Sequence, residues 1–231
     1  MVELTPPLMR GAIVQLIQDI GFVFPNIISF QYNPAKVTRA FKPWNPFDTD
    51  ATKRVATATQ AAPFDPEETY QFTLEFDATN DIELKNPIAI ATGVASRIAA
   101  VQKLVMPTAG LIGDLVGAAK ALAAKGSPAM TEVKKLPLAL LVMGPGLILP
   151  VRVTSVSVEI KEFNSLLYPL MADVALDLRV LTPEAFKCKT SVAGDFAKSA
   201  YEFTRLQEDA LAIANIANAV LDARSMLPLS F

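Results

Sequence analysis

The sequence contains no histidine and only one cysteine, Cys188. Without histidine there is no Ser-His-Asp or Cys-His triad, no histidine-ligated metal site, and no general base of the type commonest near pH 7. A single cysteine excludes an intrachain disulfide framework and a zinc site built from several cysteines. We therefore predict that the protein is not an enzyme and that it binds neither a metal nor another cofactor.

Charge is also scarce. Charged residues make up 19% of the chain, with 21 basic and 23 acidic side chains and a formal net charge of -2, whereas soluble domains average about 25% charged residues. No basic excess is present to bind a nucleic-acid backbone, so we expect no nucleic-acid partner. Hydrophobic residues make up 52%, which is enough for a core and for apolar subunit interfaces, since obligate interfaces resemble a domain core.

Uninterrupted apolar runs long enough to cross a membrane are missing too. The longest uncharged run in the middle of the chain, Leu136–Val151, is interrupted by prolines and glycines, and a spanning helix needs about 20 residues. The Ala-rich stretch Pro107–Ala124 contains Asp114 and Lys120. The first 21 residues lack the features of a signal peptide. We expect no stable membrane span and a cytoplasmic location, although the apolar composition leaves open a peripheral membrane- or lipid-associated protein.

Alternating patterns predict an antiparallel sheet. In Tyr70–Asp77 and Leu170–Val180, apolar and polar residues alternate with the two-residue period of a strand. Ile148–Phe163 also alternates, but its apolar residues change from odd to even positions, which predicts a bulge near Thr154 and Ser155. These segments predict an α+β fold with antiparallel strands.

Two segments have the spacing of helices. In Ile88–Val105, apolar residues recur every three or four positions. A second helix is expected from about Gly194 to Arg224, with its apolar stripe buried on the sheet or on a neighbouring subunit. That stripe consists of Phe196, Ala200, Phe203, Ala210, Ala214, Ala217 and Leu221, widened by Ile213, Ile216 and Val220.

These patterns divide the chain into two parts. Residues 1–182 are expected to form a β domain with an extended loop at 42–68 and a helical insertion at 86–135, and residues 183–231 a helical C-terminal extension. The loop is rich in proline and has no periodicity, and loops of this length are usually functional or disordered. Its aromatic residues Trp44, Phe47 and Phe64 are our candidates for contacts with another chain.

Carboxylates on the predicted strands raise one chemical alternative. Asp173 and Asp177 lie four residues apart on the polar face of one strand, with Glu159 on the neighbouring strand. Such carboxylates can serve acid–base chemistry or bind a divalent cation. The strict alternation favours a solvent-exposed face instead, with Lys161 and Arg179 offsetting the acidic charges across the strands.

Ile28–Val37, Tyr70–Ala78 and Leu140–Leu181 contain ordered motifs that together resemble those of tube-family proteins of phage-tail-like contractile injection systems. Ile28–Val37 is similar to the family's Phe-x-Phe-Asn-Pro strand, and Tyr70–Ala78 to its Leu-x-Phe-x-Leu-x-Phe-Asp-x-Thr strand, although Thr79 stands one place later. Leu140–Leu181 resembles the closing strands, which consist of a Gly-Pro turn, a strand, a Phe-x5-Pro loop and a final alternating strand. The order and rough spacing agree from residue 8 to residue 182.

The resemblance implies a tail-tube-like fold, an antiparallel β-sandwich or barrel with a flanking helix and, here, a long C-terminal helix. It implies a structural hub component of the baseplate: a spike adaptor that forms a hexameric ring joining the central spike to the inner tube. Copies of the same chain, the spike protein, the inner tube protein and other baseplate subunits are then the partners, within an injection particle. Asp173, Asp177 and Arg179 become candidates for the channel lining. Family members often end in a LysM module, but the residues after Thr182 match a helix, so we expect no direct glycan binding.

Overall fold

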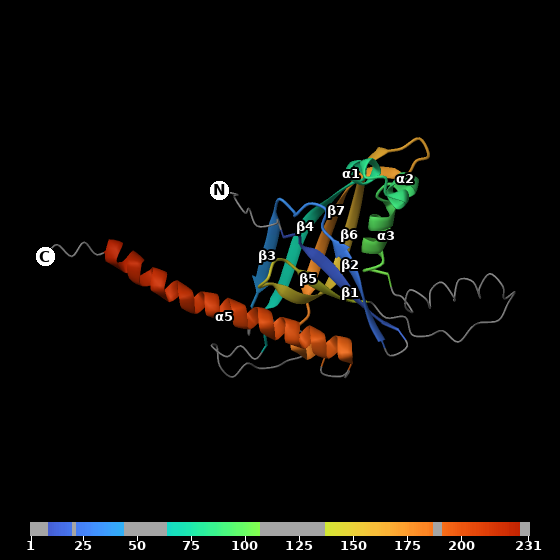
Figure 1. Cartoon of the computed structure of the whole chain (residues 1–231). Helices are drawn as coiled ribbons and strands as arrows, with labels where there is room; N and C mark the ends of the chain where they lie inside the picture. Colours follow the sequence, from blue (N-terminus) through green and yellow to red (C-terminus); the bar gives the residue numbers. More distant parts are fainter. Residues whose placement is uncertain (1–8, 20–21, 44–63, 107–136, 187–190, 227–231) are drawn as a thin grey trace, which may run out of the picture.

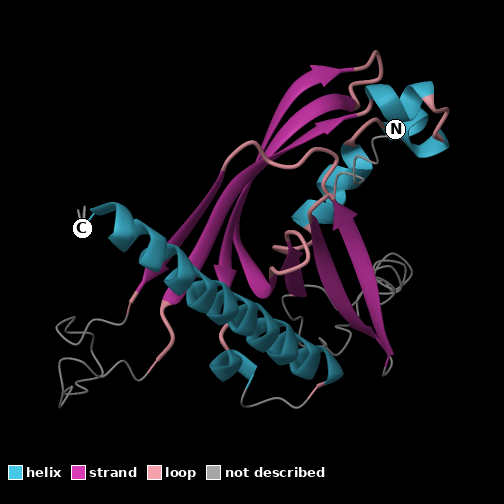
Figure 2. Ribbon diagram, turned by 60° about the vertical axis from the view of Figure 1, so that its left-hand side comes forward, coloured by secondary structure: helices cyan, strands magenta, loops and turns pink. Residues whose placement is uncertain are grey.

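The computed structural model describes residues 9–19, 22–43, 64–106, 137–186 and 191–226. Seven strands form one antiparallel sheet in the order β2–β1–β5–β6–β7–β4–β3 (Figures 1 and 2). The strands are β1 (Ala12–Asp19), β2 (Phe22–Ser29), β3 (Val37–Lys42), β4 (Glu67–Asp77), β5 (Leu138–Val142), β6 (Ile148–Phe163) and β7 (Pro169–Val180). The helices are α1 (Thr79–Glu83), α2 (Pro87–Thr92), α3 (Ala95–Gln102), the 3₁₀ turn η1 (Pro183–Phe186) and α5 (Val192–Met226). The predicted α+β fold with an antiparallel sheet and a long C-terminal helix is confirmed.

The central strands have one apolar and one polar face, as their alternation predicts. On β4 and β7, Leu74 and Val174 lie opposite each other in register and are fully buried. The intervening residues on both strands point to the other face and are exposed or half-buried. The main core therefore fills the inner face of the sheet, where alternate side chains of β4, β6 and β7 meet those of β1, β2 and α3.

The sheet is curled so that its two ends approach each other. Phe30, just after β2, contacts Phe72 on β4, with ring centroids 5.6 Å apart. The side-chain amide of Gln31 donates to the carbonyl oxygen of Asp77 at 2.6 Å and accepts from the Asp77 N–H at 2.9 Å. These contacts fix the link between β2 and β3 across the ends of the sheet.

The predicted bulge in β6 is present. The register between β6 and β7 shifts between Val153 and Ser155. At this point the hydroxyl of Thr154 donates to the carbonyl oxygen of Asp177 at 3.0 Å. The bulge turns odd-numbered apolar residues before it and even-numbered ones after it to the same face, since one extra residue reverses the alternation.

The helix predicted at Ile88–Val105 is in fact two helices, α2 and α3. Gly93 lies between them with φ +56°, in the left-handed region that favours glycine. A Cβ atom at Gly93 would lie 2.1 Å from the carbonyl oxygen of Pro169, and the N–H of Val94 donates to that same oxygen at 2.8 Å. The break therefore fits α3 against β7, where Val101 enters the core.

Helix α5 packs on the outer face of β1, β5 and β6 (Figure 2). Its contact surface is built from small side chains, with Ala193, Ala197 and Ala200 packed against Leu16 and Leu140. Small residues at this spacing let a helix approach a sheet closely.

Most members of the expected apolar stripe of α5 whose side chains are described do not lie on the sheet. Of its members, Ala200 does face the sheet, but Phe196 is 57% exposed and Phe203 is 40% exposed. Both stripes have a helical period, so periodicity alone did not distinguish them. The alternative that a neighbouring subunit covers the expected stripe stays open.

Candidate assembly surfaces

One face of the central sheet is polar and exposed. Side chains from β4, β7 and β6 form cross-strand rows on it, and these rows contain the three channel-lining candidates. The rows are Thr69–Arg179–Arg152, Gln71–Asp177–Ser155, Thr73–Ala175–Ser157 and Glu75–Asp173–Glu159. The structure therefore brings Asp173, Asp177 and Arg179 onto one face, away from the core.

Two ion pairs lie on this face. The Nζ atom of Lys161 lies 2.6 Å from Oδ2 of Asp173, and the Nε atom of Arg179 lies 3.3 Å from Oε1 of Glu67. The hydrogen bond to Asp173 raises the pKa of Lys161 above its usual value. Exposed pairs of this kind add little stability, so their main effect is a face of mixed charge, on which acidic side chains outnumber basic ones. Among the residues that the structure describes, no three acidic or cysteine side chains group closely enough to hold a metal ion.

The hairpin between β6 and β7 ends in an ordered apolar loop. The side-chain oxygen of Asn164 accepts hydrogen bonds from the N–H groups of Leu166 and Tyr168, both at 2.9 Å. The Asn164 backbone pairs with Tyr168 and Leu167 as well. Leu166 is 74% exposed and Leu167 is 78% exposed. These hydrogen bonds hold the loop in a defined conformation with two leucines in solvent. We call this loop (residues 163–168) the hairpin tip.

Two residues with a strained backbone lie at the end of the molecule that contains the hairpin tip. Among the described residues, the non-glycine residues with positive φ are Leu167, at +61°, and Lys85, at +57°. Lys85 follows the exposed Leu84 in the turn between α1 and α2, and these helices lie beside the far end of the β6–β7 hairpin (Figure 1). Left-handed conformations cost free energy for residues other than glycine, so the strain singles out these two turns.

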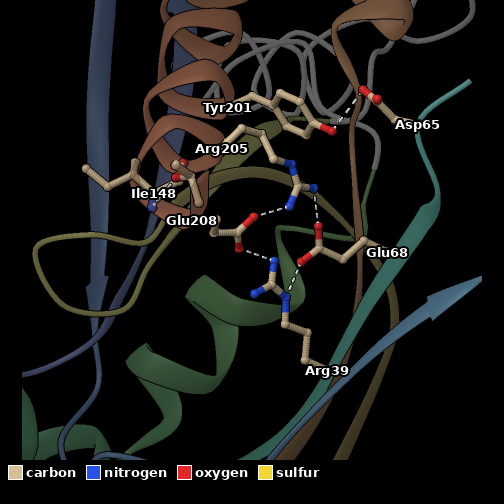
Figure 3. A network of polar contacts seen from close by, with 8 residues as sticks. Arg39, Asp65, Glu68, Ile148, Tyr201, Arg205 and Glu208 are labelled. Carbon is tan, nitrogen blue, oxygen red and sulfur yellow. Dashed lines mark hydrogen bonds and ion pairs between the residues drawn. The ribbon is translucent and has the colours of Figure 1, made fainter. Parts of the chain in front are cut away.

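A network of four charged side chains joins α5 to the sheet (Figure 3). Glu68 on β4 is 1% exposed and accepts from two arginines, Arg39 on β3 and Arg205 on α5. The Arg39 Nε–Glu68 Oε1 distance is 2.5 Å, and Arg39 and Arg205 also bind the two carboxylate oxygens of Glu208 at 2.5 and 2.6 Å. Two positive and two negative charges therefore balance within one closed ring of contacts.

Two tyrosines, Tyr201 and Tyr70, lie next to this charged network. The guanidinium of Arg205 lies 4.6 Å from the ring centre of Tyr201, whose hydroxyl donates to Asp65 at 3.0 Å. Burial opposes the charged form of Arg205, but its hydrogen bonds to Glu68 and Glu208 outweigh burial and raise its pKa. Burial raises the pKa of Tyr70, and the adjacent Glu68 carboxylate raises it further. The arginines therefore stay charged, and the network acts as a fixed electrostatic link.

The distal part of α5 is not covered by the rest of the described chain. Thr204 is the last buried residue among the α5 side chains that the structure describes. Its hydroxyl accepts a hydrogen bond from the Ile148 N–H at 2.9 Å and donates one to the Ile148 carbonyl oxygen at 2.7 Å. Beyond Glu208 every described side chain on the helix is exposed. The helix nevertheless continues to Met226 and extends past the sheet (Figures 1 and 2).

The loop candidates have different outcomes. Phe64 is 37% exposed, just before β4, whereas Trp44 and Phe47 lie outside the described residues.

Sequence reasoning missed the hairpin tip and the charged network. Two adjacent leucines in a turn were a usable signal for the tip, because turns are usually polar. The network had no comparable signal, since Arg39 and Glu208 are 169 positions apart.

Comparisons with known proteins add no identification: no protein-family model matches the chain, and no curated protein matches it. Within the described ranges, no helix is long and apolar enough to cross a membrane.

Proposed function

We propose that this chain is a structural baseplate hub component of a contractile injection system. In this proposal it forms a ring, sixfold according to the resemblance, that joins the central spike to the inner tube. The polar face that contains Asp173, Asp177 and Arg179 lines the ring's channel or contacts neighbouring rings. A polar face of mixed charge suits such a lining, because an apolar lining would bind whatever passes through it.

The separation of exposed apolar side chains from this polar face is the observation that carries the proposal. Large apolar residues are exposed at the hairpin tip, in the turn after α1, on α2, and along α5. They include Leu84, Ile88, Ile90, Leu166, Leu167, Phe203, Leu206, Leu211, Ile213 and Ile216. Extensive exposed apolar surface marks interaction sites. Several such surfaces on different elements favour a subunit with several protein neighbours.

The free sheet edges also support an assembly role. Strands β2 and β3 end the described sheet, and an open edge invites pairing with another chain. Pro25 within β2 lacks a backbone donor, which weakens that edge for pairing. Strand β3 (Val37–Lys42) contains no proline and is the better edge for a neighbouring subunit. Rotational closure of such contacts stops growth at a fixed number of copies.

Imaging of assembled particles tests the proposal. We expect particles purified with this protein to show it as a sixfold ring between the spike and the tube, with the three polar side chains on the channel wall. Any other symmetry contradicts the ring. Packing of Asp173, Asp177 and Arg179 in a dry core contradicts the lining.

A peripheral lipid-binding role is a second candidate, favoured by the hairpin tip. Its two exposed leucines lie beyond the aromatic residues Phe163 and Tyr168, and Asn164 satisfies N–H groups of the loop internally. Internally satisfied backbone groups lower the cost of entering lipid. Flotation of the purified protein with liposomes supports this candidate, and failure to float with either neutral or anionic liposomes contradicts it.

A further inference from the structure

Strand β3 is an open edge of the sheet. It pairs with β4 on one side and with no described strand on the other. In an antiparallel pair every second residue directs its N–H and carbonyl groups toward the partner strand, and the residues between direct theirs away from it. The outward groups of Val37–Lys42 have no hydrogen-bond partner in the described part of the chain. An edge of this kind binds an extended segment that adds one more strand.

The side chains of β3 alternate between the two faces of the sheet. Val37, Arg39 and Phe41 share the inner face with the buried residues of β4 opposite them. Phe41 is 49% exposed, and the guanidinium of Arg39 lies 4.5 Å from its ring centre. Thr38 and Ala40 lie on the polar face and are exposed. A strand added at this edge therefore places every second side chain beside Val37 and Phe41, and the others on the polar face.

Basic residues dominate this edge. Between Pro34 and Pro43 the chain contains Lys36, Arg39 and Lys42 and no acidic residue. Arg39 is already neutralised within the charged network. Both lysines are exposed, and neither forms an ion pair with a described carboxylate. Opposite charges across an interface select between partners, so these two lysines favour an acidic segment.

We infer that β3 binds an extended segment of another protein in which apolar and acidic residues alternate. The inference rests on the assembly role proposed above and specifies the chemistry of one partner. The backbone of β3 supplies the hydrogen bonds, Val37 and Phe41 supply the apolar contact, and Lys42 supplies a positive charge on the polar face. Glu67 lies opposite Lys42 but pairs with Arg179, which leaves the lysine available to a partner.

A second copy of the chain matches this edge less well. Lysine on an edge strand deters pairing with a strand of like charge, and two β3 strands side by side bring the lysines of both copies together. The other edge of the described sheet, β2, contains Pro25 and no charged residue, so it lacks one backbone donor and has no acidic side chain. The described part of a second copy therefore supplies no matching strand.

Binding of synthetic peptides to the full-length protein tests the inference. The probe is a capped peptide of about six residues, a common strand length, in which valine and glutamate alternate. One control peptide has lysine in place of glutamate. A second control keeps the sequence of the probe but has N-methylated backbone amides, which cannot donate hydrogen bonds. Affinities are measured by isothermal titration calorimetry.

Two matched variants of the protein locate the contact. Lys42→Glu reverses the charge at the edge, opposite the start of β4. Lys85→Glu makes the same change in the turn between α1 and α2, beyond the other end of β4. Both lysines are exposed, so neither change should unfold the chain, and circular dichroism verifies folding.

We expect the valine–glutamate peptide to bind the wild type, and to bind Lys42→Glu about five- to tenfold more weakly because an attraction becomes a repulsion. Lys85→Glu should bind the peptide as the wild type does. The added peptide should also slow the hydrogen exchange of those β3 amides that point away from β4, measured for each residue by NMR.

Several results overturn the inference. They are absence of binding, equal affinity for the lysine or the N-methylated peptide, and an affinity of Lys42→Glu equal to that of the wild type. Slow exchange of the outward β3 amides in the isolated chain also overturns it, because the edge is then already covered. Imaging of particles tests the ring separately: the ring can stand when the peptide fails to bind, and the peptide can bind when the ring is refuted.

Discussion

Arg205 on α5 donates a hydrogen bond to the buried carboxylate of Glu68 on β4, 137 positions away in the chain. Glu68 is enclosed between this arginine and Arg39, and Glu208 completes the ring of charges. Besides this network, α5 is attached to the body through its alanines, the Thr204–Ile148 hydrogen bonds and the buried Tyr201, which donates to Asp65. The charged network is therefore one of several contacts that orient the helix, and it is the one that joins it to β3 and β4.

Replacement of Glu68 by glutamine should destabilise the protein. The change leaves two partly buried guanidinium groups with one carboxylate, Glu208, and breaking a buried pair costs about 3–5 kcal/mol. Because the two arginines remain 28% and 25% exposed, we expect a smaller loss of about 2–3 kcal/mol in the free energy of unfolding. Urea denaturation measures it. The neighbouring Glu67→Gln, at an exposed pair with Arg179, should cost less than about 1 kcal/mol; equal losses in the two variants would contradict the role given to Glu68.

Stability should fall in acid partly through Glu208. Burial opposes its charged form, but hydrogen bonds from Arg205 and Arg39 outweigh burial and lower its pKa below the usual 4.5. A carboxylate with a lowered pKa stabilises the folded state above its unfolded pKa, and this stabilisation is lost as the pH falls through the folded value. We expect Glu208→Gln to be less stable than the wild type near pH 7 and to lose less stability below pH 4.5. Urea midpoints from neutral to acidic pH test this, with Glu202→Gln on the same helix as control; parallel wild-type and Glu208→Gln profiles would contradict it.

The sequence predicted the sheet better than the contacts that complete the fold. The strands β4 and β7 and the bulge in β6 follow from local alternation, because each side chain's neighbours in sequence decide which face it takes. The orientation of α5 does not follow from local pattern. Its alanine stripe and its phenylalanine stripe both have helical spacing, and Leu16 and Leu140 on the sheet decide between them. The break at Gly93 likewise depends on Pro169, 76 positions away.

Gly93→Ala, which adds a single methyl group, should strongly lower the free energy of unfolding. A methyl group there meets the carbonyl oxygen of Pro169 at 2.1 Å and also requires φ +56°. We expect a loss of about 2 kcal/mol or more in the free energy of unfolding, since strain and clash add. Gly146→Ala is the control, because its nearest neighbour atom lies at 3.8 Å and its φ is not in the left-handed region. Thermal and urea denaturation compare the two, and a Gly93→Ala protein as stable as Gly146→Ala would show that the α2–α3 break tolerates side chains.

The hairpin tip offers a way to separate contact from stability. The double variant Leu166→Ser/Leu167→Gly removes two exposed leucines and places a glycine at position 167, where it adopts the positive φ without strain. Relief of strain at that residue is offset by the greater freedom of glycine in the unfolded chain. We therefore expect the free energy of unfolding to stay within about 1 kcal/mol of the wild type.

Under the assembly role proposed above, incorporation into particles should respond quite differently to the same double variant. Exposed apolar side chains held in a strained, internally hydrogen-bonded loop contribute to a contact rather than to the core, so incorporation into particles should fall sharply. Asn164→Ala is the complementary variant: it keeps both leucines but removes the acceptor of the Leu166 and Tyr168 N–H groups. It should reduce incorporation less than loss of the leucines while lowering stability more. Incorporation is measured as the amount of this chain per particle after purification, beside urea denaturation of the free protein. Incorporation of the double variant at the wild-type level would show that the tip contacts nothing in the particle. The exposed leucines add little to the core, so a contact is the role that this experiment tests.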